Sequence, residues 1–271
     1  MTGLKKLLLA SIAAVAVMTG CTRDDEEQIL READDISGEQ AEMIIEMEKA
    51  QSLFFDATEQ ASYASGSEET SEPKCYEVVY NESKGDMKFV VGFGEGCKDQ
   101  FGVTRSGKIT QNNRTTDKGV EMSYKLENYA VDGYTLSGTV SVNSLKRDDK
   151  GMLTYTYKLE DAKVGTPQGK SYLVSRTLQF RQADNPGSIN YYVTGGGSVI
   201  NAAGVEYTSE IVKPALYKGG CFSEGNFYPL SGVAQVDFED GKFFTVDFGS
   251  GSCDKAAKIL AGEKELALAL K

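Results

Sequence analysis

The sequence lacks histidine and tryptophan entirely, although it runs to 271 residues. Histidine is the side chain most often used as a general base and as a transition-metal ligand. Without it, Ser250 in the stretch Gly249-Ser250-Gly251 cannot belong to a serine–histidine triad. We therefore expect a protein that is not an enzyme and that needs no metal ion or other cofactor.

A basic surface stripe is also missing. The net charge is −11, and residues 22–60 alone carry thirteen acidic residues against three basic ones. Proteins that bind nucleic acids use clustered basic side chains to displace counterions from phosphates. A nucleic-acid partner is therefore excluded. The length and the hydrophobic content of 40% are nevertheless sufficient for a sizeable core.

The N-terminal segment has the organisation of a bacterial lipoprotein leader. Two lysines precede residues 7–18, which are dominated by apolar side chains. This run is too short to cross a bilayer but has the length of a signal-peptide core. The small dipeptide Thr19-Gly20 then precedes Cys21. This arrangement resembles the lipobox, in which the cysteine is acylated and becomes the mature N-terminus.

We predict a lipoprotein signal peptide at residues 1–20 and a lipid on Cys21, with palmitate among its acyl chains. Two or three acyl chains hold a protein stably on a bilayer, whereas one chain holds it only marginally. Met18 departs from the leucine that is usual at its position. An ordinary secretory leader that happens to end near a cysteine is the alternative interpretation.

An acidic tether, residues 21–36, begins at the lipidation site. Residues 22–27 are similar to the acid-rich signal that follows the acylated cysteine in surface-exposed lipoproteins of Bacteroidota. The same charges also suit a flexible, solvated segment that does not collapse. We expect attachment to the bacterial outer membrane with the body at the cell surface, and the periplasmic face is the alternative.

An amphipathic helix is predicted over residues 37–63. Ser37 and Gln40 have the spacing of a capping box, which satisfies two backbone donors at a helix N-terminus. Apolar residues then recur at alternating spacings of three and four. They are Met43, Met47, Ala50, Phe54, Ala57 and Ala61, and the opposite side carries Glu42, Glu46, Lys49, Asp56 and Glu59. We expect the apolar stripe to dock on the body of the protein, beyond a small, polar linker at residues 64–74.

From Cys75 onward, the hydrophobic period changes from helical to two. Residues 120–127 and 153–160 each alternate apolar with polar side chains, as strands with one buried face do. Turns that contain glycine separate such runs. They are Asp132-Gly133, residues 149–151 and Asp240-Gly241.

The β-rich body is predicted to span residues 75–271. Residues 75–262 show no long helical period, so alternating βαβ units are excluded. The fold class is therefore mainly β: an antiparallel meander, built as a curved sheet, a sandwich or an open barrel, with one N-terminal amphipathic helix. We expect the concave or open face of the sheet to receive that helix. Residues 263–271 are expected to be helical again.

One phrase occurs twice in the body. Residues 89–97 and 244–253 each contain a hydrophobic strand, then Phe-Gly-x-Gly, then a cysteine, and each phrase has a second cysteine upstream. The phrases indicate two related units at the ends of the body.

Four cysteines allow three pairings, which spacing alone does not decide. The expected hairpins favour Cys75 with Cys97 and Cys221 with Cys253, and an oxidising compartment would sustain both bridges. A zinc site is the alternative use of these cysteines, although they include no C-x-x-C pair.

The duplicated phrase and the acid-rich leader together resemble a family of outer-membrane lipoproteins of Bacteroidota. In that family, a Val-Asp-Phe-Gly-x-Gly-Cys type of segment recurs near both ends of a β-rich body. Asp247 matches the acid before Phe-Gly, whereas Gly92 departs from it. The resemblance implies a location and an architecture but no activity and no catalytic residue.

Other motifs have ordinary structural explanations. Residues 165–171 are one residue short of a phosphate-binding loop and are followed by a strand-like run, so we expect a turn. Asp148-Asp149 and Glu239-Asp240 lack the ligand spacing of a calcium loop. The fourteen tyrosines are expected mainly to fill the core, although exposed tyrosines can stack on sugars or peptides.

We expect a non-catalytic, lipid-anchored envelope protein that binds or scaffolds a partner. Its contacts would be the membrane, through the lipid on Cys21, and an extracellular glycan or protein. One alternative is an acid-pair hydrolase of glycans, which needs two carboxylates about 5 to 10 Å apart in one cleft. The other is a carrier of an apolar envelope ligand, which needs a large dry pocket on the concave face.

Overall fold

The computed structural model describes residues 36–66, 75–83, 86–99, 102–117, 119–149, 151–185, 188–222 and 224–270. The predicted signal peptide, Cys21 and the acidic tether up to residue 35 lie outside the described residues, as does the linker from residue 67. Within the described part of the chain, no helix combines the length and apolar character that a membrane crossing requires.

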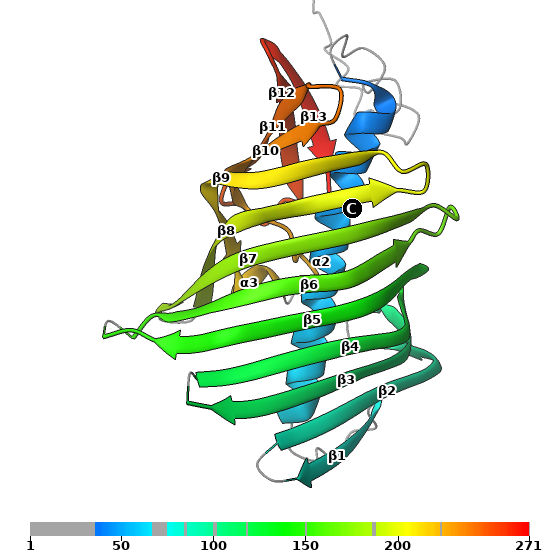
Figure 1. Cartoon of the computed structure of the whole chain (residues 1–271), viewed down its shortest axis with the longest axis vertical. Coiled ribbons are helices and arrows are strands. Elements are labelled where there is room, and N and C mark those ends of the chain that lie inside the picture. Colours follow the sequence, from blue (N-terminus) through cyan, green and yellow to red (C-terminus); the bar gives the residue numbers. More distant parts are fainter. Residues whose placement is uncertain are drawn as a thin grey trace, which may run out of the picture.

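A single sheet dominates the molecule, and its described residues form thirteen strands in which each strand pairs with the next along the chain. Every pairing is antiparallel, so the sheet is the predicted meander (Figure 1). The strands are β1 Glu77–Ser83, β2 Asp86–Lys98, β3 Thr104–Thr116, β4 Gly119–Val131, β5 Tyr134–Arg147, β6 Leu153–Gly165, β7 Ser171–Asn185, β8 Ser188–Asn201, β9 Glu206–Lys218, β10 Ser231–Phe238, β11 Phe243–Ser250, β12 Ala256–Ala261 and β13 Lys264–Ala269.

The glycine turns form where the sequence predicts them. Val131 pairs with Tyr134, so Asp132 and Gly133 alone connect β4 to β5. Their φ angles are 46° and 84°. Positive φ at both central residues is the requirement of a tight hairpin turn whose twist matches the flanking strands. Residues 165–171 likewise contain a turn, with the Thr166 N–H donating to the Lys170 carbonyl.

Helix α2, Gly38–Gly66, is the long N-terminal helix. The capping box is present: the Gln40 N–H donates to Ser37 Oγ at 3.1 Å, and the Ser37 N–H donates to Gln40 Oε1 at 3.0 Å. The helix continues three residues beyond the predicted end at residue 63. Figure 1 shows it crossing strands β2 to β9, with its N-terminus at the β9 side.

The apolar stripe of α2 is buried as predicted, but its charged side is not left to solvent. Asp56 is buried and Glu59 is half-buried. The cause is that a second segment covers α2 in addition to the sheet, and we call this segment, between β9 and β10, the second cover. The ring of Phe55 contacts the ring of Phe180 on the sheet and also the ring of Phe222 in α3, Gly219–Phe222. The helix is therefore enclosed by the curved sheet and by the segment between β9 and β10.

The expected helix at residues 263–271 is wrong, because β13 occupies most of this segment. Ile259 on β12 pairs with Leu266. Leu266, Leu268 and Leu270 are buried, which is the period of a strand. Alanine, leucine and glutamate are good helix formers, but intrinsic propensity is small compared with tertiary contacts, and pairing with β12 overrides it.

Both predicted disulfides are present, Cys75–Cys97 and Cys221–Cys253. The first lies beside a β-bulge, because the register between β2 and β3 shifts on each side of Gly94, whose φ is 62°. This bulge accounts for the glycine at position 94, because a β-bulge can require a residue with positive φ.

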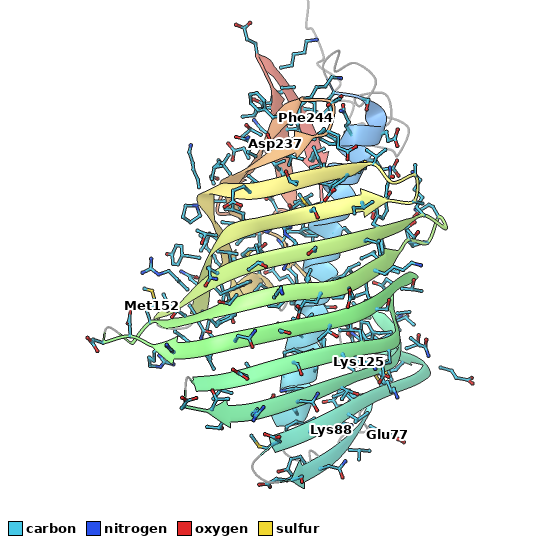
Figure 2. All side chains as sticks on the ribbon, in the orientation of Figure 1. Glu77, Lys88, Lys125, Met152, Asp237 and Phe244 are labelled. Atoms are coloured by element: carbon cyan, nitrogen blue, oxygen red, sulfur yellow. A yellow bond between two sulfur atoms is a disulfide. The ribbon has the colours of Figure 1, made fainter. Side chains whose placement is uncertain are left out.

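Side chains project from both faces of the sheet (Figure 2). Lys125 is exposed on the outer face of β4, whereas its neighbours Tyr124 and Leu126 are buried. Most tyrosines are core residues, as expected, although Tyr192 is exposed.

Candidate ligand-binding site

Arg105 on β3 links the sheet to α2 through a buried ion pair with Asp56. Its Nη1 donates to Asp56 Oδ2 at 2.6 Å and to the Tyr129 hydroxyl at 2.7 Å, and its Nη2 donates to Asp56 Oδ1 at 3.1 Å. Its Nε donates to Asp99 Oδ2 at 2.9 Å. Burial raises the pKa of Asp56, and Arg105 opposes that shift. All three nitrogen atoms of the guanidinium therefore donate hydrogen bonds to side chains of the protein.

A second buried pair lies further along the interface between α2 and the sheet. Arg176 Nη1 on β7 lies 3.7 Å from Glu48 Oε1. A side chain at Gly197 on β8 would collide with Arg176, since its Cβ would lie 2.7 Å from Arg176 Cγ. The Cβ would also lie 2.0 Å from the Ser175 carbonyl oxygen, so glycine at this position permits the close approach of β8 to β7 beside Arg176. Burial raises the pKa of Glu48.

A pocket of about 440 Å³ opens beside the first of these pairs. Lys49, Ser52 and Asp56 form its helical wall. The other walls come from the start of β3, the β4–β5 turn, and the segments that follow Cys221 and Cys253. They contribute Val103, Arg105, Val131, Asp132, Glu224, Gly225, Phe227, Tyr228 and Lys255. We refer to this cavity as the Lys49 pocket.

Each copy of the duplicated phrase has a cysteine close to a segment that lines the Lys49 pocket. Cys97 lies opposite Arg105 in the pairing of β2 with β3. The Cys221–Cys253 disulfide joins the segment leading to Tyr228 with the segment leading to Lys255. The four cysteines are near segments that line the pocket, but none of them lines it, and Cys21 lies outside the described residues.

Three cationic and three acidic side chains line the Lys49 pocket, and two of the cationic ones are Lys49 and Lys255. Burial lowers the pKa of Lys49, and the positive charge of Lys255 lowers it further, whereas Asp132, Glu46 and Asp56 oppose the shift. Lys49 Nζ lies 5.4 Å from the centre of the Tyr134 ring and 5.8 Å from that of Tyr228. An ammonium group held among rings and near a second cation gains from a bound anion.

Aromatic surface completes the pocket. Phe227 and Tyr228 line it and are buried. The Phe227 ring stacks on Phe222 with a centroid distance of 5.0 Å. This aromatic wall is held rigidly and can cover the apolar part of a ligand.

Sequence reasoning did not identify Lys49 and Arg105 as site residues. Lys49 has the position of a solvent-facing lysine in the helical pattern, but Tyr134 of the sheet and Tyr228 of the second cover lie beside it. No pattern in the sequence marked Arg105, because the second copy of the phrase has Ala261 at the same distance after Cys253. Among the described residues, no cluster of aspartate, glutamate and cysteine is arranged to hold a metal ion. The alternative zinc site is ruled out because the four cysteines are bonded to one another.

Comparison with models of protein families, with curated proteins and with solved structures finds no match to this chain.

Proposed function

We propose that this protein is a non-catalytic, lipid-anchored envelope protein that binds a small organic anion in the Lys49 pocket. One observation carries the proposal: Lys49 and Lys255 line an aromatic-walled cavity of about 440 Å³. A carboxylate between the two ammonium groups relieves their repulsion, and the aromatic wall covers the apolar part of the same ligand.

The other charges of the pocket favour a small ligand with a single anionic group. Arg105 is paired with Asp56 and Asp99, and the acidic residues Asp132, Glu46 and Asp56 also act on Lys49. A bound anion would add to these contacts of the two lysines. Asp132 and Glu224 are exposed at the entrance, where they disfavour a ligand with several negative charges. An aromatic or branched carboxylic acid suits this combination.

The cellular location proposed for this binding activity comes from the leader. The basic residues, the short apolar run and Cys21 support lipid attachment, and the acid run after Cys21 supports exposure at the surface of the outer membrane. Resemblance to Bacteroidota outer-membrane lipoproteins supports the same location. A surface-anchored protein meets small anions released outside the cell.

The two alternative functions have less support. An acid-pair hydrolase needs two carboxylates available to the substrate. Of the three carboxylates that line the Lys49 pocket, Asp56 is held by Arg105 and Asp132 accepts a hydrogen bond from the Thr104 N–H. α2 lies on the concave face where an apolar ligand would be carried. A carrier would have to move this helix and expose its ion pairs.

Benzoate is a suitable probe of the Lys49 pocket, with neutral benzamide as its matched control. In calorimetric titrations, we expect saturable benzoate binding that exceeds benzamide binding. Lys49→Gln and Lys255→Gln each remove a charge-assisted contact of about 1.5 to 3 kcal/mol, so each is expected to weaken benzoate binding about tenfold or more. The exposed Lys163 on β6 provides the control variant Lys163→Gln, which should bind like the parent protein.

Circular dichroism verifies that each variant is folded, and Lys255→Gln keeps the test valid if Lys49→Gln does not fold. The proposed site is wrong if benzoate binds equally to Lys255→Gln and Lys163→Gln. It is also wrong if the parent protein shows no saturable binding of benzoate.

A further inference from the structure

A second pocket lies against a different face of α2, next to strands β4 to β8. Its volume is about 170 Å³. Phe55 and Glu59 line it from the helix, and four tyrosines line it from the sheet: Tyr124, Tyr155, Tyr157 and Tyr191. None of the described residues that line it is a lysine or an arginine. We refer to it as the tyrosine pocket.

The rings of the tyrosine pocket are fixed by contacts with one another. Phe55 meets Tyr157 and Tyr191 edge to face, at centroid distances of 6.3 and 5.9 Å. Tyr155 stacks on Phe180 at 5.0 Å. The hydroxyls of Tyr124 and Ser62 lie 2.9 Å apart. Because the walls are preorganised, a ligand that enters does not have to order them.

Glu59 is the charged group of this pocket. It is half-buried and forms no ion pair with a described residue. Burial raises its pKa to about 7, and the nearby Asp56 contributes in the same direction. A carboxylate in this state gains from any cation that enters the pocket, because the cation supplies the missing counter-charge.

We propose that the tyrosine pocket binds a small organic ammonium ion, with Glu59 as its counter-ion and the tyrosine rings as its cage. Ring faces attract cations, and a desolvated cation over an aromatic face gains about 2 kcal/mol. A cavity of about 150 Å³ in another protein holds benzene, so 170 Å³ accommodates a trimethylammonium group. This site is separate from the Lys49 pocket and does not depend on the function proposed there.

Binding of the cation should depend on pH through Glu59. The titratable groups that face it are Asp56 on α2 and the tyrosines of the sheet. Asp56 is paired with Arg105, and burial raises the pKa of Tyr124 to about 12, so that this tyrosine stays neutral. Burial likewise raises the pKa of Tyr155 and Tyr157.

The cation prefers the ionised carboxylate, which is the minor form below the Glu59 pKa of about 7 and the major form above it. Affinity is therefore expected to rise about tenfold between about pH 6 and pH 8.

Choline and its uncharged isostere 3,3-dimethylbutanol test the proposal on the unmodified protein. Titrations followed by NMR or calorimetry at pH 8 should show choline binding at least about tenfold tighter than the isostere. Glu59→Gln should weaken choline binding at least about tenfold and abolish its pH dependence. Glu77→Gln, which removes one charge from the exposed strand β1, should change neither.

Equal affinity for choline and for 3,3-dimethylbutanol would overturn the proposal, as would the absence of saturable choline binding. Choline binding by Glu59→Gln with the affinity and pH profile of Glu77→Gln would overturn it too. The comparison of the two probes needs no variant, so it stands even if Glu59→Gln does not fold.

Discussion

Replacing Arg105 with methionine is expected to lower the free energy of unfolding by about 3 to 5 kcal/mol, because it leaves a buried carboxylate without its counter-charge. Arg105 is 2% exposed and binds Asp56 through two hydrogen bonds. Its loss also removes partners from Asp99 and from the Tyr129 hydroxyl. Urea denaturation of the two proteins measures the difference.

Arg114→Met is the matched control for this prediction. Arg114 is also on β3 and forms an ion pair, but its side chain is 68% exposed and its Nε lies 3.8 Å from Asp86. Exposed pairs of this kind contribute about 0 to 1 kcal/mol. Equal losses of stability in the two variants would mean that Arg105 does not hold α2 in a buried interface.

Phe55→Ala is expected to cost about 3 to 5 kcal/mol, the range for removing a phenylalanine side chain from a packed core. The Phe55 ring lies within 6.3 Å, centroid to centroid, of six other rings. These rings belong to Tyr157, Phe180, Tyr191, Tyr217, Phe222 and Phe227. They come from both covers of α2, so truncation leaves a cavity that neither cover can fill alone.

Tyr63→Ala provides the comparison on the same helix. Tyr63 is 62% exposed, and exposed substitutions away from special features usually change stability by less than about 0.5 kcal/mol. Urea midpoints of both variants would be compared with that of the parent protein. If Phe55→Ala were no more damaging than Tyr63→Ala, α2 would not be enclosed in the way described.

Much of the fold could be predicted from local patterns. The change from a helical period to a period of two at Cys75 separates α2 from the sheet, and dipeptides such as Asp132-Gly133 mark the hairpins. Sequential hairpins then lead directly to a meander, because each strand finds its partner beside it along the chain. The strand at the C-terminus was missed because its leucines also fit a helix and only pairing with β12 decides between the two.

The candidate sites were less accessible to sequence reasoning. The cysteine pairs could be predicted because each pair spans the hairpins that bring it together. Lys49, Asp56 and Glu59 instead occupy the charged side of an amphipathic pattern, which is normally solvated. Lys49 and Asp56 share a pocket with Phe227 and Tyr228, and Glu59 shares one with tyrosines of the sheet. These partners are far away in the sequence, and no local period encodes the contacts.

The proposed function at the cell surface depends on attachment, because the proposed anchor would determine which ligands reach the two pockets. The lipid proposed on Cys21 is therefore the central claim. The most direct test is the intact mass, with N-terminal peptide sequencing, of the mature protein extracted from bacterial membranes. We predict a chain that begins at Cys21, lacks residues 1–20 and carries the added mass of its acyl chains. An unmodified Cys21, or mature protein that retains residues 1–20, would contradict it.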